Sequence, residues 1–332
     1  MERSEIKNRY SQIGIAYTVF VIVMYAVSFI IKLVMTTNNL HISSSWLNYL
    51  VGLAPIWMFG FPVCFILIKN MQHTRPEDQK LSIGFGFKFY FILTFLMITG
   101  NIVGRIIGYL LSHLLGISID NTTIDMISRQ DILPSIIFAV ILGPMLEELA
   151  FRKLLIDRLW FLSKKHTIFL SGFMFALFHT NLYQFFYAFL VGVIFAYIYT
   201  ITGRIRYTIM LHMIINFVHG IVPVILIKMM DVDKLARIAV LSPESEEARK
   251  LAFELIKSPG FLLFILYLLV LLGFIITGLV LFIKNVKRMR VDDSMSPLQG
   301  PGSVSAVYKN MGMILFVISM IAFTVFEIVI SQ

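Results

Sequence analysis

Charged side chains are scarce in this 332-residue sequence: Asp, Glu, Lys and Arg make up 14% of it, and hydrophobic residues make up 58%. An ordinary soluble domain carries roughly 25% charged and 45–50% apolar residues. This scarcity excludes a soluble globular fold, which has no interior large enough for so much apolar surface. The apolar residues also form long runs, such as 13–31 and 261–283, and about 18 apolar residues suffice to cross a bilayer core. The sequence therefore predicts an integral membrane protein.

Cysteine is almost absent, since Cys64 is the only one. A disulfide within the chain is excluded, and the apolar neighbours of Cys64 indicate a small buried hydrophobe. The sequence also lacks the H-E-x-x-H zinc motif, the G-x-S-x-G nucleophile elbow and the glycine-rich phosphate loop. The formal charge of +9 comes from short basic clusters beside apolar runs. That placement favours loops facing anionic lipid over nucleic-acid binding.

The apolar runs predict an all-α, polytopic transmembrane bundle with about nine spans in a single membrane domain, residues 1–332. The fifth span is short, so it needs tilt, local thinning of the bilayer or burial inside the bundle. The expected spans are 13–35, 47–69, 87–113, 133–158, 166–180, 182–201, 207–228, 261–284 and 309–330.

The distribution of Lys and Arg predicts the orientation of the chain. Basic residues precede the first span and follow the second, fourth, sixth and eighth spans. Cytoplasmic loops carry this excess, so we expect the amino terminus in the cytoplasm. Residues 231–258 are then an external loop with an amphipathic helix or two. Residues 285–305, rich in Pro and Gly, are a flexible cytoplasmic loop.

The fourth span contains three residues that are costly in a membrane, Glu147, Glu148 and Arg152. An ionised side chain near the bilayer centre costs roughly 2.5–3.5 kcal/mol on insertion scales, so such residues are usually functional. Glu148 and Arg152 are four residues apart and predict an ion pair along the helix. Glu147 has no basic residue three or four positions away. We therefore expect Glu147 to activate water, and Glu148 and Arg152 to position the site.

Two further spans carry polar residues in matching positions. Phe175 and His179 share one helix face, as do His212 and Asn216. Counted from the basic ends of their helices, Glu147, Asn216 and His179 lie ~15–20 Å deep and His212 lies ~9 Å deep. His219 follows His212 by seven residues on the same face and is a weaker candidate for supporting the site.

These groups suit water-activating hydrolysis, for which peptide bonds are the natural substrate. In one version a glutamate takes a proton from water, a histidine relays it, and His and Asn donors stabilise an oxyanion. In the other, Glu147, His179 and His212 bind a zinc ion whose open position holds water. The sequence leaves both versions open.

The motifs resemble those of the CAAX-protease and bacteriocin-processing family of intramembrane endopeptidases, also called the Abi-type family. Its pattern is Glu-Glu-x-x-x-Arg, Phe-x-x-x-His and His-x-x-x-Asn, each on a separate transmembrane helix. The chain matches it at seven positions within a core at 133–220: Glu147, Glu148, Arg152, Phe175, His179, His212 and Asn216. The ninth span and the long loop after the seventh are additions to the expected eight-span core.

The resemblance implies proteolysis within the membrane, with or without a divalent metal. It also implies a hydrophobic peptide as substrate, either a prenylated carboxyl terminus or a bacteriocin-like peptide, most naturally in a bacterial plasma membrane. The alternatives are a non-catalytic immunity or receptor scaffold of the same fold, or a transporter with Glu147 and Glu148 as proton relays. The set of intact motifs disfavours the scaffold, and the lack of an inverted repeat disfavours the transporter.

Overall fold

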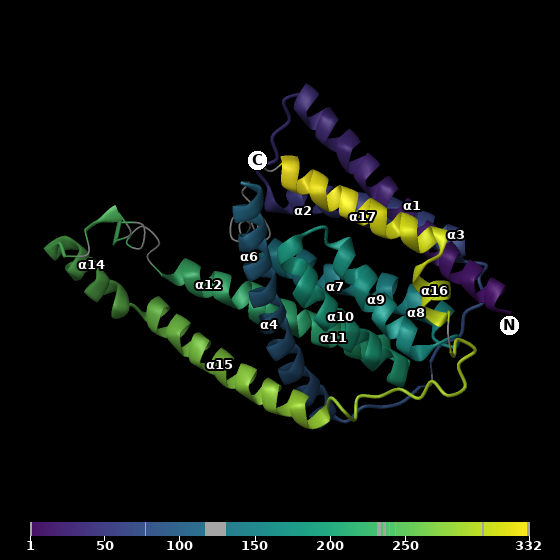
Figure 1. Cartoon of the computed structure of the whole chain (residues 1–332). Coiled ribbons are helices and arrows are strands. Elements are labelled where there is room, and N and C mark those ends of the chain that lie inside the picture. The colour runs from purple at the N-terminus through teal and green to yellow at the C-terminus, as the bar shows by residue number, and fades with distance from the viewer. Residues whose placement is uncertain are drawn as a thin grey trace.

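The computed structural model describes residues 2–76, 78–116, 131–230, 234, 237–238, 240–242, 244–300 and 302–330. These residues form helices joined by irregular connections, with no β-strand, which confirms the all-α prediction (Figure 1). Several predicted spans are composites of α-helical and π-helical turns (η).

The amino-terminal half begins with α1 (Arg3–Thr37), followed by a composite helix and by α4 (Ile83–Leu115). The segments of this half are α1, α2 (Ser45–Ala54), η1 (Pro55–Gly60), α3 (Phe61–Ile68), α4, α6 (Ile132–Ser135), η2 (Ile136–Leu142), α7 (Gly143–Glu148), η3 (Leu149–Leu154) and α8 (Leu155–Leu159). The second half contains α9 (Lys164–Phe178), α10 (Leu182–Thr202), α11 (Ile205–Asn216), η4 (Phe217–Ile221), α12 (Val222–Met229), α14 (Glu246–Ile256), α15 (Pro259–Asn285), α16 (Ser303–Tyr308) and α17 (Met311–Ile330).

Eight helices of the described chain are long and apolar enough to cross a membrane. The predicted fifth span is absent from this group because α9 has only 15 residues, about 22 Å of helix against a core of about 30 Å. Most of α9 is buried, and it packs against α10 over its length. Burial inside the bundle is thus how this short helix is accommodated.

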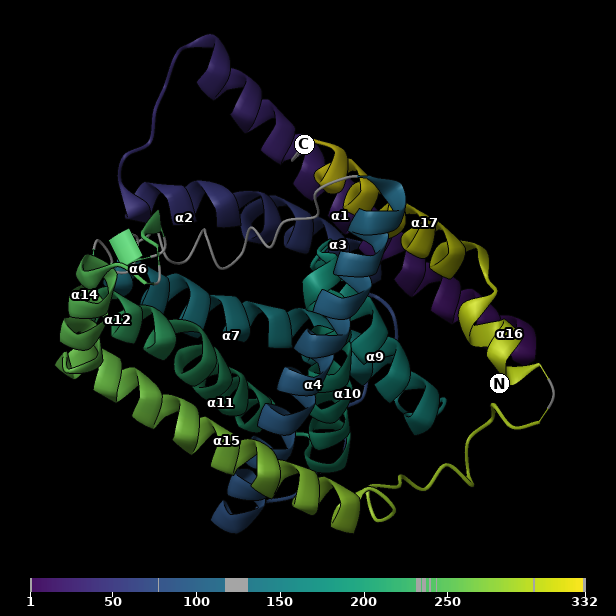
Figure 2. The same ribbon diagram turned by 60° about the vertical axis from the view of Figure 1, so that its left-hand side comes forward.

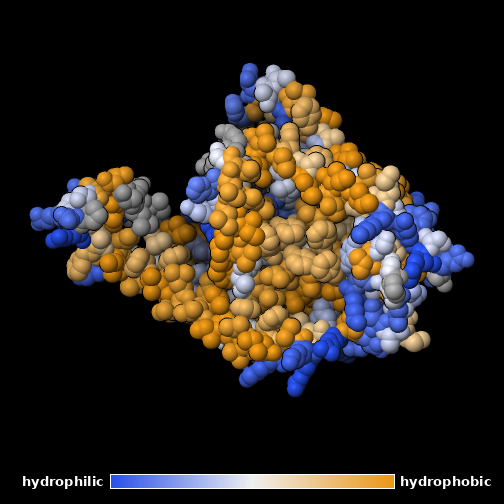
Figure 3. All heavy atoms as spheres, viewed as in Figure 1, coloured by the Kyte–Doolittle hydropathy of each residue, from blue (hydrophilic) through white to orange (hydrophobic). Residues whose placement is uncertain are grey.

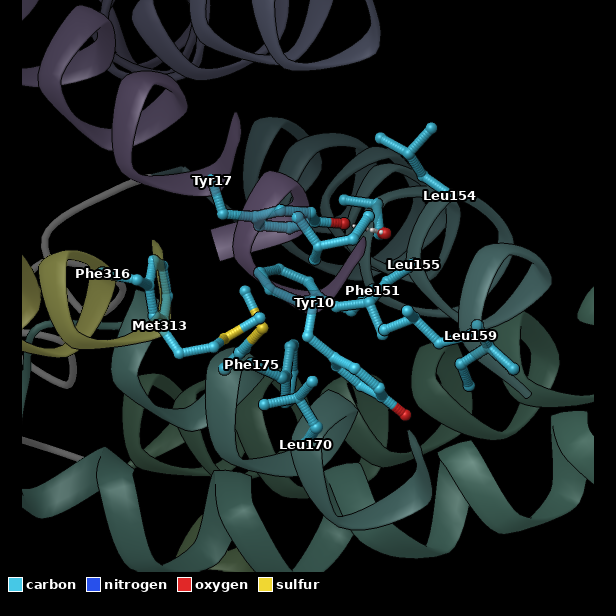
Figure 4. Close-up of a cluster of buried hydrophobic side chains, with 14 of the residues drawn as sticks. Tyr10, Tyr17, Phe151, Leu154, Leu155, Leu159, Leu170, Phe175, Met313 and Phe316 are labelled. Carbon is cyan, nitrogen blue, oxygen red and sulfur yellow. Dashed lines mark hydrogen bonds between the residues drawn. The ribbon is translucent and has the colours of Figure 1, made fainter. Parts of the chain in front are cut away.

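A hydrophobic core joins the first and last helices to the predicted catalytic region. Tyr17 of α1 and Phe316 of α17 point toward Phe151 of η3 and Phe175 of α9 (Figure 4). The Tyr17 hydroxyl donates a hydrogen bond of 2.6 Å to the Ala150 carbonyl. Helix α17, the predicted ninth span, therefore packs on the bundle mainly against α1. A second core lies between α4, α10 and α11, with α15 outside it (Figure 2).

The contact between α1 and α17 depends on two glycines. A Cβ atom on Gly14 or Gly312 would overlap backbone atoms of the opposite helix. Small residues allow this close approach, which is how helices commonly associate in membranes. Helix α1 also begins ten residues before the predicted span, because Ile6 and Tyr10 are buried against the bundle and extend the helix.

The basic connections before α1 and after α3, α8, α10 and α15 gather at one end of the molecule, which we call the basic end; α14, which carries Arg249 and Lys250, lies away from it (Figure 1). The amino-terminal Arg9 donates a 3.0 Å hydrogen bond to the Arg158 carbonyl, and the Thr74 amide donates one of 2.8 Å to the Asp157 carbonyl. In the space-filling view, hydrophilic residues lie around the amino terminus and the end of α15, and an apolar surface covers α4 and α15 (Figure 3). The predicted alternation of basic connections is consistent with this arrangement.

The described parts of the two long polar segments contain a helix and an anchored connection. Within 231–258, residues 231–233, 235–236, 239 and 243 lie outside the described part, and α14 is an amphipathic helix. In the 285–305 connection, Asp293 accepts hydrogen bonds from the Ser163 hydroxyl (2.6 Å) and the Lys164 amide (2.7 Å). The Pro and Gly residues predicted a flexible loop, and in the structure these bonds attach its Asp293 to the turn before α9.

Candidate active site

The fourth apolar helix is irregular around the two glutamates. Pro144 stands in the first turn of α7, with π-helical turns before and after this short segment. Proline lacks an amide hydrogen and its ring crowds the preceding turn, so the regular α-helical bonding is broken there. Wider π-turns of this kind occur frequently at functional sites.

Glu148 and Arg152 form the ion pair that their spacing predicted. Arg152 Nε lies 3.1 Å from Glu148 Oε2, and both side chains are completely buried. Arg152 Nη1 also donates a 2.9 Å hydrogen bond to Ser171 Oγ, and this hydroxyl donates to the Phe151 carbonyl at 2.7 Å. The pair is thus fixed between η3 and α9.

Aromatic rings surround the guanidinium of Arg152. The rings of Phe175 and Phe195 have their centres 4.9 and 5.8 Å from it, within the range of a cation–π contact. The sequence motifs identified Phe175 but missed Phe195 and Ser171. A hydroxyl within the apolar run of α9 was a usable signal for Ser171, whereas nothing distinguishes Phe195 among 30 phenylalanines.

His212 lies between the two glutamates and faces both of them. Its Nδ1 atom is 3.1 Å from Glu148 Oε1, and its Nε2 atom is 3.6 Å from Glu147 Oε2. The His212 ring is buried, while the Glu147 side chain is 23% exposed. Adjacent residues on one helix thus reach opposite nitrogens of one imidazole, and only Glu147 has an accessible side.

His179 lies at the end of α9, where the chain turns back into α10. Thr180 has a left-handed backbone (φ 47°), and the Asn181 side chain caps α10 by accepting hydrogen bonds from its first amides. The Phe175 ring lies edge-on to both imidazoles, with its centre 4.9 Å from that of His179 and 6.0 Å from that of His212. The second and third motifs therefore converge on Phe175.

Asn216 makes a contact that the motifs did not predict. Its Nδ2 atom donates a 3.0 Å hydrogen bond to the Ala139 carbonyl in η2. One amide hydrogen therefore ties α11 to the irregular fourth helix, and a second hydrogen is left to donate elsewhere. His219, the weaker candidate, lies 3.2 Å from the Thr94 hydroxyl of α4 and stacks near Tyr90.

The three predicted metal ligands have suitable chemistry but do not form a metal-binding group. Among the described residues, no cluster of three or more His, Cys, Asp and Glu side chains is arranged to hold an ion. Glu147 and His212 approach each other, whereas His179 is in contact with the Phe175 ring. The metal-bound version of the site therefore stays a prediction.

The core of the chain matches a known family. The model described as "Rce1-like: Type II CAAX prenyl endopeptidase Rce1-like" matches residues 129–218. This segment therefore resembles the Rce1-like endopeptidases, as the motifs predicted. The match includes all seven motif residues and indicates a CAAX-type endopeptidase of the membrane. No curated protein and no solved structure matches the chain.

Proposed function

We propose that this protein is an intramembrane endopeptidase in which Glu147 and His212 activate water against a peptide bond. Its substrates are hydrophobic peptides of the membrane, such as prenylated carboxyl termini or bacteriocin-like peptides. We place the protein in a bacterial plasma membrane, with its amino terminus in the cytoplasm. The observation that carries the proposal is that each ring nitrogen of His212 faces a different glutamate.

The Glu148–Arg152 pair determines which ring nitrogen of His212 carries the hydrogen. Arg152 holds Glu148 as a carboxylate, which can only accept hydrogen bonds. The Nδ1 atom of His212 therefore donates to Glu148, and the Nε2 atom is left as an acceptor toward Glu147. A buried carboxylate that orients an imidazole and stabilises its cationic form serves the same purpose in hydrolytic triads.

Glu147 and His212 are placed to contact one water molecule. At 3.6 Å the two groups are too far apart for a good direct hydrogen bond, and a water lying beside the pair, on the accessible side of Glu147, can contact both. Glu147 accepts a proton as the water oxygen attacks the peptide carbonyl carbon. His212 shares that proton and delivers it to the departing amine nitrogen, so each proton removed from water is returned to a product.

The remaining motif residues position the substrate and the imidazoles. Phe175 keeps the two imidazoles apart and covers Arg152. His179 and the free amide hydrogen of Asn216 are donors for the oxyanion of the tetrahedral intermediate. Glu148 and Arg152 act through His212 and are positioning residues.

The test is cleavage of a hydrophobic quenched-fluorescent peptide library by the purified protein in lipid nanodiscs. Glu147→Gln should reduce turnover about 100-fold or more, the contribution expected of a general base, and Glu244→Gln, in an exposed turn, is the matched control. Turnover by Glu147→Gln equal to the control would disprove the assigned role. A wild-type protein that binds these peptides without cleaving them would support the scaffold alternative.

A further inference from the structure

The basic end contains a hollow that the proposed proteolysis does not use. Its volume is about 480 Å³, which is within the range of roughly 300–1,000 Å³ usual for small-molecule sites. It lies where α10 ends and α11 begins, beside η3 and the connection before α4. The lining residues are Arg75, Asp78, Lys153, Tyr199, Gly203, Arg204, Ile205 and Arg206.

Positive charge predominates in this hollow. Of the described side chains that line it, four are cationic and only Asp78 is anionic. Asp78 is shared, because Arg75 lies 3.0 Å from one carboxylate oxygen and Arg204 is in contact with the other. One carboxylate therefore cannot neutralise both guanidinium groups.

Lys153 is paired with an acidic residue that does not line the hollow. Its Nζ atom lies 2.6 Å from Asp157, a buried residue whose second oxygen accepts a hydrogen bond from the Tyr199 hydroxyl. With Asp157 included, four cations face two carboxylates. Arg206 is exposed and extends near the Tyr207 ring, 5.3 Å from its centre. The excess of two positive charges is thus presented to solvent within a concave surface.

We propose that this hollow binds a phosphate group, and that its natural occupant is the headgroup of an anionic phospholipid. Guanidinium groups match the oxygens of a phosphate with paired hydrogen bonds. The hollow lies at the ends of helices α10 and α11, which belong to segments long and apolar enough to span a membrane, and basic pockets between such helices bind anionic headgroups on the cytoplasmic side. A membrane-embedded protein meets these lipids at far higher local concentration than free phosphate.

Binding at this site links elements from three parts of the chain. Lys153 belongs to η3, Arg204 and Arg206 flank the start of α11, and Arg75 comes from the connection before α4. A phosphate that contacts all of them joins these elements more firmly and stabilises the folded protein by its binding free energy. The proposal does not depend on the protein being a protease.

The experiment compares the wild-type protein with Arg206→Gln in nanodiscs of phosphatidylcholine, with and without phosphatidylglycerol. Thermal stability and the lipid retained in native mass spectrometry are measured. Arg288→Gln is the matched control, because it removes an exposed cation after α15 outside the hollow. We expect phosphatidylglycerol to stabilise the wild type and Arg206→Gln to weaken its retention about fivefold, the effect of one cation near an anionic surface, with little change for Arg288→Gln.

Two results would overturn the proposal. Equal losses of phosphatidylglycerol retention in Arg206→Gln and Arg288→Gln would show that lipid binding depends only on the overall positive charge of the basic end. A second arm adds inorganic phosphate to the phosphatidylcholine nanodiscs. If phosphate alone stabilises the wild type as strongly as phosphatidylglycerol, and Arg206→Gln removes that effect, the occupant is a soluble phosphate and the lipid assignment is wrong.

Discussion

Replacing Glu148 by glutamine separates the two adjacent glutamates more sharply than any other single change. The replacement removes the negative charge from a pair that is completely buried, and Arg152 remains as an uncompensated cation. Breaking a buried ion pair by removing one partner costs about 3–5 kcal/mol. Ser171 continues to accept a hydrogen bond from Arg152, and the new amide oxygen can accept another. We therefore expect about 3 kcal/mol, the low end of that range.

Glu147→Gln should behave differently in the same measurement. Its side chain is partly exposed, and the His212 imidazole lies 3.6 Å from its carboxylate. Partly solvated pairs contribute only about 0–1 kcal/mol. The two variants should therefore differ in unfolding free energy by about 2 kcal/mol or more, although both lose turnover.

The assay is unfolding in mixed micelles, followed by the loss of helical circular dichroism as a denaturing detergent is added, together with peptide cleavage in the folded state. The double variant Glu148→Gln/Arg152→Met is the control, because removing both charges should recover most of the lost stability but not the activity. Our reasoning is refuted if Glu148→Gln unfolds at the wild-type detergent fraction. It is equally refuted if Glu147→Gln is the less stable and more active of the two.

Three further predictions concern packing, topology and metal dependence. Gly312→Ala should destabilise the protein by about 1–3 kcal/mol, as overpacking does, because its methyl group overlaps the α1 backbone; Gly273→Ala, which meets open space, should not. In a Cys64→Ala background, a cysteine at the exposed position of Arg75 should resist an impermeant reagent applied to intact cells, and its labelling would reverse the proposed orientation. Chelators should leave cleavage by the purified protein unchanged if glutamate alone activates water, whereas loss of activity that zinc restores would establish the metal-bound version.

The positions of the motifs relative to each other follow partly from local geometry. The Glu148–Arg152 contact was predictable because both residues are on one helix and the i, i+4 spacing alone brings them together. The separate roles expected of Glu147 and Glu148 also had a local basis, since successive helical residues point about 100° apart. Their different exposures agree with that expectation.

The contacts of His212 and Asn216 required the tertiary structure. His212 reaches both glutamates because α11 packs against α7, and no spacing within the sequence specifies that crossing. Asn216 donates to Ala139 because the helix around η2 is irregular and its carbonyls are not all engaged in α-helical bonds. Periodicity predicts which face a residue occupies, but not which helix will cover that face.

The sequence by itself determined the membrane location, the all-α class and the helices that carry each motif, because long apolar runs and the cost of buried charge are properties of composition and order. Only the tertiary structure decided that the short α9 is buried inside the bundle, that Asp293 fixes the 285–305 connection, and that four cations from separate segments surround one hollow. Each of these depends on packing between residues far apart in the chain. Such packing is set by the sum of many weak contacts, which a single sequence does not display.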